Sequence, residues 1–165
     1  MSAPFREADM SGRTTDGRAT DSVVIEGYAS LFEVEDMAGD VVRAGAFSRS
    51  LARGGGIGML LSHAGGRTAG RWTSIREDGR GLFVRGLVVG ETAAGKAALE
   101  GIRAGRLSGL SIGFLARDWA PRGVRGRILR EIDLREVSLV TSPMLTSARF
   151  SAVGGAMAFA ALRTA

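Results

Sequence analysis

The chain has 165 residues, which is long enough for one domain with a hydrophobic core and too short for two ordinary domains. Although 45% of the residues are hydrophobic, no apolar run approaches the roughly eighteen residues of a membrane-spanning helix, so we expect a soluble protein with no membrane partner. The chain contains no cysteine and one histidine, which excludes disulfides and thiolate sites and argues against a zinc site. We therefore predict that the protein uses neither a metal nor a cofactor.

The net charge is +5 at pH 7, and nearly all of the basic residues are arginines spread along the chain. Together with the abundant glycine and alanine, this arginine content is typical of a GC-rich genome, so it does not indicate a particular binding partner. Binding of nucleic acid through its phosphates is an alternative that rests on charge alone. With 6% aromatic residues the chain offers few side chains for base stacking, so we do not expect a nucleic-acid partner.

The N-terminal third predicts an arm, a strand and a short helix. Residues 1–21 are polar, without an apolar period, and predict a flexible arm that carries no secretory signal, which favours the cytoplasm. From residue 22 the segment SVVIEGYASLF alternates apolar with small or polar residues, which is typical of a half-buried strand. An acidic loop follows, and residues 44–51 lead into a short helix that glycines 54–56 close.

The middle of the chain predicts a strand and a hairpin. Residues 57–62 are apolar and form a strand that ends at His63, followed by a polar, glycine-rich loop. Residues 70–78 and 81–89 flank Asp78-Gly79, a hairpin signal because glycine supplies the positive φ of tight turns. The single histidine is therefore expected at a junction between a strand and a loop.

The last third predicts a helix and further strands. Residues 92–104 place Thr92 at the N-cap position and several apolar side chains on one face. Residues 107–116 form a strand that contains Ser111, and residues 125–141 form either a strand pair or one bent strand.

One domain is expected over residues 22–150, followed by a flexible or removable tail at 151–165. Many strands with two inserted helices predict an α+β fold. We expect a mainly antiparallel sheet that curls into a β-barrel with flanking helices.

Two residues carry the strongest chemical signal, His63 and Ser111. Histidine is the one side chain that titrates near neutral pH without perturbation, so His63 is the candidate base for a serine nucleophile. Gly109-Leu110-Ser111-Ile112-Gly113 matches the Gly-x-Ser-x-Gly pattern of α/β-hydrolases, but here a helix precedes the serine and a strand follows, the reverse of that motif. A tightly packed strand around Ser111 and an ordinary surface histidine are the plainer alternatives.

A catalytic imidazole works best when a third group fixes its tautomer. The candidates on the last predicted strand are Glu131, Asp133 and Glu136, and the acidic loop adds Asp36 and Asp40. The residue pattern does not choose among these five.

Four segments in register resemble the prohead maturation proteases of tailed bacteriophages and gene transfer agents. They are GYASLFEVEDMAGDVVRAGAF, LLSHAGGRTAGRWTSIREDGRGLFVRG, AALEGIRAGRLSGLSIGF and REIDLREVSLVTSPMLTSARF. The resemblance covers residues 22–150 and implies a serine endopeptidase with the fold of herpesvirus assembly proteases. By the same resemblance His63 and Ser111 are the catalytic pair and Glu136 is the third member, in place of the second histidine of the herpesvirus enzymes. Arg117, just after the serine strand, is a further candidate to help stabilise the oxyanion.

The resemblance also implies partners. The expected substrates are the scaffolding segment of the major capsid protein and the protease itself, cut inside the assembling procapsid in the bacterial cytoplasm. A homodimer is compatible with this, because related viral enzymes are activated by dimerisation or crowding. The alternative is a non-enzymatic capsid assembly factor of the same fold, in which Ser111 and His63 do no chemistry.

Overall fold

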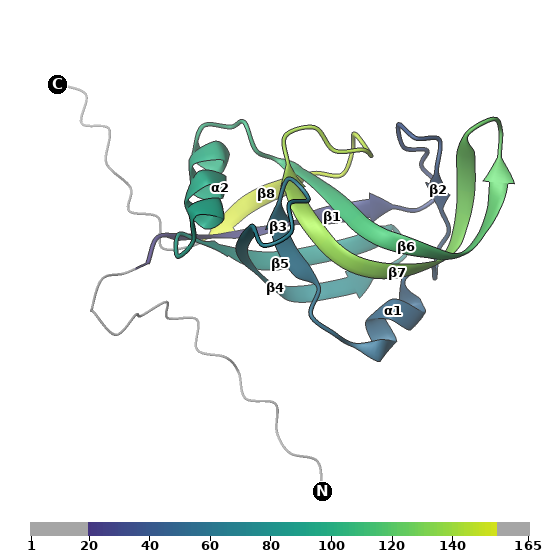
Figure 1. Cartoon of the computed structure of the whole chain (residues 1–165), viewed down its shortest axis with the longest axis horizontal. Helices are drawn as coiled ribbons and strands as arrows, with labels where there is room; N and C mark the ends of the chain where they lie inside the picture. The colour runs from purple at the N-terminus through teal and green to yellow at the C-terminus, as the bar shows by residue number, and fades with distance from the viewer. Residues whose placement is uncertain (1–19, 155–165) are drawn as a thin grey trace, which may run out of the picture.

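The computed structural model describes residues 20–154, and Figure 1 shows their arrangement. The elements are β1 (Ser22–Leu31), β2 (Val41–Val42), α1 (Ser48–Arg53), β3 (Gly58–Leu61), β4 (Thr68–Glu77), β5 (Gly81–Val89), α2 (Ala93–Arg103), β6 (Gly109–Arg122), β7 (Gly126–Val140) and β8 (Phe150–Gly154). The predicted arm and tail lie, apart from residues 20–21 and 151–154, outside the described residues. Within these residues no helix has the length and apolar character needed to cross a membrane.

The described strands form one mixed sheet in the order β2-β7-β3-β4-β5-β1-β8, with β6 paired to β7. Most pairs are antiparallel, as predicted, but β2 and β3 both run parallel to β7. The predicted closed barrel is wrong, because the sheet stays open. One edge of β6 pairs with β7 along its length, while its other edge meets the segment before β8 at an isolated bridge between Gly109 and Arg149.

The longest pairing in the sheet joins β6 and β7, whose hairpin tip extends away from the other strands in Figure 1. Residues 125–141, for which either a strand pair or one bent strand was expected, form the single strand β7. Register shifts after Gly113 and near Asp118 interrupt the ladder, and such bulges bend a strand and increase its twist. The hairpin thus curves while it carries both Ser111 and Glu136.

The core lies on the inner face of this sheet and is built mainly from aliphatic side chains, together with Phe47 and Phe150. The largest fully buried side chains are Ile25, Phe47, Met59, Leu82, Leu99, Leu110, Leu129, Ile132 and Leu139. Burial of such side chains stabilises the fold by about 1.5–3 kcal/mol each. Val137 and Leu139 of β7 belong to this core, so Glu136 and Ser138, which alternate with them, lie on the opposite face of the strand.

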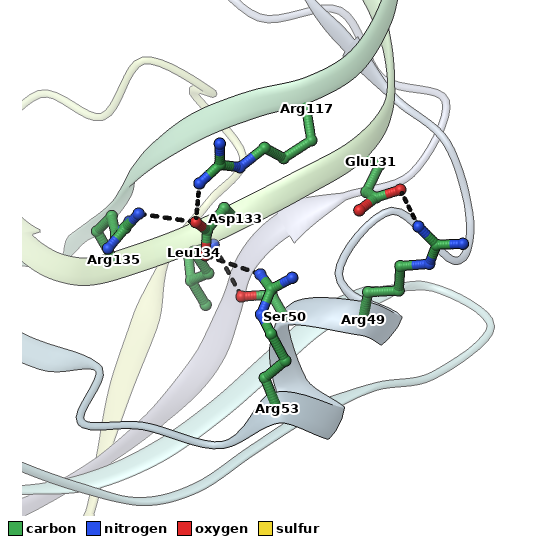
Figure 2. Close-up of polar contacts among 8 residues, drawn as sticks. All are labelled: Arg49, Ser50, Arg53, Arg117, Glu131, Asp133, Leu134 and Arg135. Atoms are coloured by element: carbon green, nitrogen blue, oxygen red, sulfur yellow. Dashed lines mark hydrogen bonds and ion pairs between the residues drawn. The ribbon is translucent and has the colours of Figure 1, made fainter.

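Helix α1 docks against one edge of β7, between the stretches of that strand that pair with β2 and with β3, through the polar contacts that Figure 2 shows. The backbone N–H of Leu134 donates to Ser50 Oγ at 2.9 Å, in a buried position. Arg53 contacts Asp133 at 3.0 Å and Arg49 contacts Glu131 at 3.2 Å. The serine satisfies a strand N–H that would otherwise be buried without an acceptor.

Helix α2 begins as the sequence predicts. Thr92 is extended, and its side chain accepts a hydrogen bond from the N–H of Gly95. Ala94, Ala98 and Leu99 are buried on one face, against the sheet.

The hairpin between β4 and β5 also forms where predicted, but by a different means. Gly79 is not in the left-handed region. The turn is held instead by Asp78, whose Oδ1 accepts from the N–H groups of Arg80 and Gly81 at 2.8 and 3.1 Å.

The first and last strands of the described residues lie next to each other in the sheet. β1 starts at Ser22, and β8 continues to Gly154, four residues beyond the predicted end of the domain. β8 pairs with β1, so these residues form part of the sheet.

Candidate active site

His63 stands directly after β3, in a tight turn. Ser62 and His63 both adopt positive φ, 55° and 58°, a conformation that non-glycine residues rarely take and that clusters at functional sites. The N–H of Ser62 donates to the carbonyl of Leu139 at 3.0 Å, and the N–H of His63 donates to Ser138 Oγ at 3.2 Å. The turn therefore leads the chain away from β3 while both backbone N–H groups stay bonded to β7.

The imidazole of His63 contacts the carboxylate of Glu136, with Nδ1 and Oε1 2.6 Å apart. The side chain of His63 is 44% exposed and that of Glu136 is 14% exposed. An ionised carboxylate can only accept, so the contact places the proton on Nδ1 and leaves Nε2 as an acceptor. This is the tautomer that a general base for a hydroxyl needs.

Glu136 is held from two further sides. Its Oε2 accepts a hydrogen bond from the hydroxyl of Ser138, two residues along the same strand. Its carboxylate lies over Gly113, the Cα partner of Glu136 on β6. A Cβ on Gly113 would lie 2.7 Å from the carboxyl carbon of Glu136, which is closer than such atoms approach, so the carboxylate occupies space that a side chain would fill.

Ser111 lies on β6 as the Cα partner of Ser138. Partners in an antiparallel pair project from the same face of the sheet, so Ser111 shares its face with Ser138 and Glu136. Ser111 is 8% exposed. Among residues 20–154 the structure contains no hydrogen bond between its hydroxyl and His63. Catalytic hydrogen bonds often close only when substrate binds.

The other acidic candidates are engaged elsewhere. Glu131 pairs with Arg49, while Asp133 contacts three arginines, Arg53, Arg117 and Arg135, as Figure 2 shows. The hydrogen bond from Arg117 is the largest cause of the lowered pKa of Asp133, followed among the favourable causes by the nearby charges of Arg135 and Arg53. Arg117, the sequence candidate for oxyanion stabilisation, therefore points its guanidinium at Asp133.

The two acidic candidates in the loop before β2, Asp36 and Asp40, shape that loop. Asp40 forms a bidentate pair with Arg127 on β7, with Nε of the arginine on Oδ1 and Nη2 on Oδ2. Asp36 Oδ1 accepts from the N–H groups of Ala38 and Asp40, and its pKa is raised, chiefly by burial. Of the five acidic candidates, Glu136 is the one that contacts His63 within the described part of the chain.

A hollow that is partly open to solvent lies beside Ser111. Its lining is mainly apolar and includes Leu110, Ile112 and Phe114 of β6, with Leu31 and Met144 from neighbouring segments. Ser111 forms part of the wall, as do Asp36 and Asp40. Such a hollow fits an apolar side chain of a ligand bound next to Ser111. Residues 20–154 contain no group of three or more acidic or histidine side chains that could hold a metal ion.

The model of the Caudovirus prohead serine proteases matches residues 8–159. The chain belongs to this family. The predicted resemblance is thereby confirmed, and with it a peptidase family. The prohead protease of Enterobacteria phage HK97 is 37% identical over 137 residues, which cover 79% of this chain and 60% of that protein. The chain thus spans about 60% of the length of this relative.

Two solved structures share the fold of this prohead protease family member. The capsid assembly protease of bacteriophage T4 matches with a TM-score of 0.58 at 19% identity, covering 71% of this chain and 80% of that one. KSHV protease, solved with a hexapeptide phosphonate inhibitor, matches with a TM-score of 0.52 at 10% identity, covering 81% of this chain and 65% of that one. At these identities the likeness shows the fold alone, and it agrees with the predicted herpesvirus-protease-like fold.

Sequence reasoning singled out neither Ser138 nor the role of Gly113. A signal for Ser138 was available, because residues two apart on a strand share a face and Glu136-Val137-Ser138 therefore places a hydroxyl beside the carboxylate. Gly113 had no such signal, since its role depends on the strand that lies next to it.

Proposed function

We propose that this protein is a serine endopeptidase of head maturation, with Ser111 as the nucleophile, His63 as the general base and Glu136 as the residue that orients His63. The observation that carries the proposal is the 2.6 Å contact between His63 Nδ1 and Glu136 Oε1. Glu136 and Ser111 lie on the same face of the β6–β7 hairpin. Membership in the prohead serine protease family supports the reaction class.

The proposed reaction is acyl transfer to water. Ser111 Oγ attacks the peptide carbonyl carbon while its proton passes to His63 Nε2, and the resulting imidazolium donates that proton to the leaving amine. Water then attacks the acyl-enzyme with His63 again as base, which releases the acid and regenerates Ser111. Glu136 stays ionised and stabilises the imidazolium. The base contributes about 10² to 10⁴-fold to the rate.

The proposed substrates are the scaffolding segment of the major capsid protein and the protease itself, cut inside the procapsid of a tailed phage or gene transfer agent. The name of the HK97 relative, a prohead protease, supports this setting. The apolar hollow beside Ser111 would receive an apolar substrate side chain close to the cleaved bond. A homodimer is compatible with the proposal.

The experiment is to co-express the chain with its major capsid protein and to measure the capsid protein's intact mass. The wild type, Ser111→Ala and Ser151→Ala are compared. Ser151 is exposed on β8 and serves as the control for loss of a serine hydroxyl. We expect a shortened capsid protein with wild type and Ser151→Ala, and the full-length mass with Ser111→Ala.

A full-length capsid protein in all three samples, with particles still assembling, would contradict the proposal. That result would favour the alternative of a non-enzymatic assembly factor. A shortened capsid protein with Ser111→Ala would instead remove Ser111 from the role of nucleophile.

A further inference from the structure

We infer that Ser138 is a positioning residue, whose single hydroxyl fixes both the backbone of His63 and the carboxylate of Glu136. The inference rests on the proposed function, because it concerns how the proposed base is oriented. Ser138 is fully buried on β7, with Ser111 of β6 as its Cα partner on one side and Leu60 of β3 on the other. A strand with ladder partners on both sides holds this hydroxyl in a fixed place.

As a donor, Ser138 fixes the carboxylate. The hydroxyl has one proton, and an ionised carboxylate is acceptor only, so the bond runs from Ser138 Oγ to Glu136 Oε2. The other oxygen, Oε1, contacts His63 Nδ1 at 2.6 Å. With both oxygens engaged, the carboxylate cannot rotate without losing one of the two contacts.

As an acceptor, Ser138 fixes the turn. Its Oγ receives the N–H of His63 at 3.2 Å, and His63 is in the left-handed conformation with φ of 58°. A non-glycine residue keeps that conformation when its surroundings hold it there. The hydroxyl therefore bonds to His63 at its main chain and, through Glu136, at its side chain, which closes a ring of three hydrogen bonds.

The ring predicts what loss of the hydroxyl does. Without it, Glu136 Oε2 loses its donor and the N–H of His63 loses its acceptor, so the carboxylate is free to turn away from Nδ1. The imidazole proton would then move toward Nε2, the nitrogen that must be unprotonated to accept the Ser111 proton. Catalysis falls while the sheet, whose ladder uses backbone groups, remains in place.

The test uses two substitutions of matched shape. Ser138→Thr keeps the hydroxyl, and Ser138→Val has the same branched shape as threonine with a methyl group in place of the hydroxyl. Ser138→Ala removes the hydroxyl without adding bulk. The first readout is the tautomer of His63, measured by long-range ¹H–¹⁵N NMR in a Ser111→Ala background. His63 is the chain's single histidine, so its signals need no further assignment.

We expect the Nδ1–H tautomer to dominate with Ser138 and with Ser138→Thr, and to give way to the Nε2–H tautomer with Ser138→Val and Ser138→Ala. The second readout is the rate at which a fluorophosphonate labels Ser111 when that serine is present. Loss of one hydrogen bond to a charged group predicts a fall of about 10- to 100-fold for Val and Ala, and Thr should recover most of the rate.

An unchanged tautomer in Ser138→Val and Ser138→Ala would overturn the inference. So would failure of both of these variants to fold while Ser138→Thr folds, since Ser138 would then serve the stability of the sheet. Absence of labelling in the wild type would count against the proposed function instead, and the tautomer measurement would still decide the role of Ser138.

Discussion

The carboxylate of Glu136 lies over Gly113 on the neighbouring strand, where a Cβ would come within 2.7 Å of its carboxyl carbon. The second glycine of the Gly-x-Ser-x-Gly pattern thus leaves room for an acid rather than forming a nucleophile elbow. Ser111 lies two residues before Gly113 on the same face of β6. The spacing of serine and glycine therefore sets Ser111 and Glu136 on one face of the hairpin.

Gly113→Ala should displace the Glu136 carboxylate and slow the reaction. A misplacement of about 1 Å in a catalytic group typically costs about 100-fold, and we expect a fall of that order in kcat/KM for cleavage of the capsid protein. The melting temperature should change little, because the atoms that must move belong to the Glu136 side chain and not to the backbone of the sheet. Gly65→Ala is the control, because nothing lies within 4 Å of a Cβ there. Equal activity of both variants would show that the carboxylate need not lie over Gly113.

Glu136→Gln should reduce kcat/KM by up to about 10⁴-fold, since it removes the charge that stabilises the imidazolium and allows the wrong tautomer. The matched control is Glu131→Gln on the same strand, which loses an exposed ion pair with Arg49. Cleavage of the capsid protein by both variants is compared at equal protein concentration. If Glu131→Gln were the inactive one, the assignment of the third residue would be wrong.

Ser50→Ala tests how α1 is attached to β7. The substitution leaves the buried N–H of Leu134 without its acceptor, which predicts a loss of about 1–3 kcal/mol in the free energy of unfolding. Urea unfolding monitored by circular dichroism measures it, with exposed Ser151→Ala expected to stay within about 0.5 kcal/mol of wild type. A loss for Ser50→Ala no larger than that of Ser151→Ala would show that another acceptor replaces the serine.

Asp78 should contribute stability that depends on pH. The hydrogen bond from Tyr28, assisted by the N–H of Arg80, lowers the pKa of Asp78 from 3.8 to about 2. Because the folded pKa lies below the unfolded one, this stabilisation is present above about pH 4 and is lost as the pH falls toward 2.

The measurement compares urea unfolding of wild type and Asp78→Asn across that range. The stability difference should be largest above about pH 4 and shrink toward pH 2, and Tyr28→Phe should reduce the pH dependence. A difference that stays constant with pH would mean that the Asp78 carboxylate has the same pKa in the folded and unfolded chains.

Local features of the fold were predictable because they depend on neighbouring residues. Thr92 caps α2, and the apolar run before His63 forms β3, as their patterns predicted. The turn at Asp78 was placed correctly but for the wrong physical reason, since a side chain rather than a positive-φ glycine holds it.

The long-range pairings were not predictable in the same way. β3 joins β7 in parallel although Leu60 and its partner Ser138 are far apart in the chain, and no local pattern encodes that choice. Whether the sheet closes depends on which strand edges pair with each other, and the hydrophobic periodicity of the sequence does not contain that information. The same pairing brings His63 to Glu136. Residue types alone therefore left five acidic residues as candidates for the third catalytic residue, whereas in the structure one of these five contacts His63.

The central claim is that His63 activates Ser111 for attack. Its most direct test is to treat assembled particles that contain the wild type, His63→Ala or Ser111→Ala with a fluorophosphonate, and to locate the adduct by peptide mass spectrometry. The account predicts an adduct on Ser111 in the wild type, labelling slowed by at least about 100-fold in His63→Ala, and none at position 111 in Ser111→Ala. Labelling of Ser111 at the same rate in His63→Ala and wild type, or an adduct on a different serine, would contradict it.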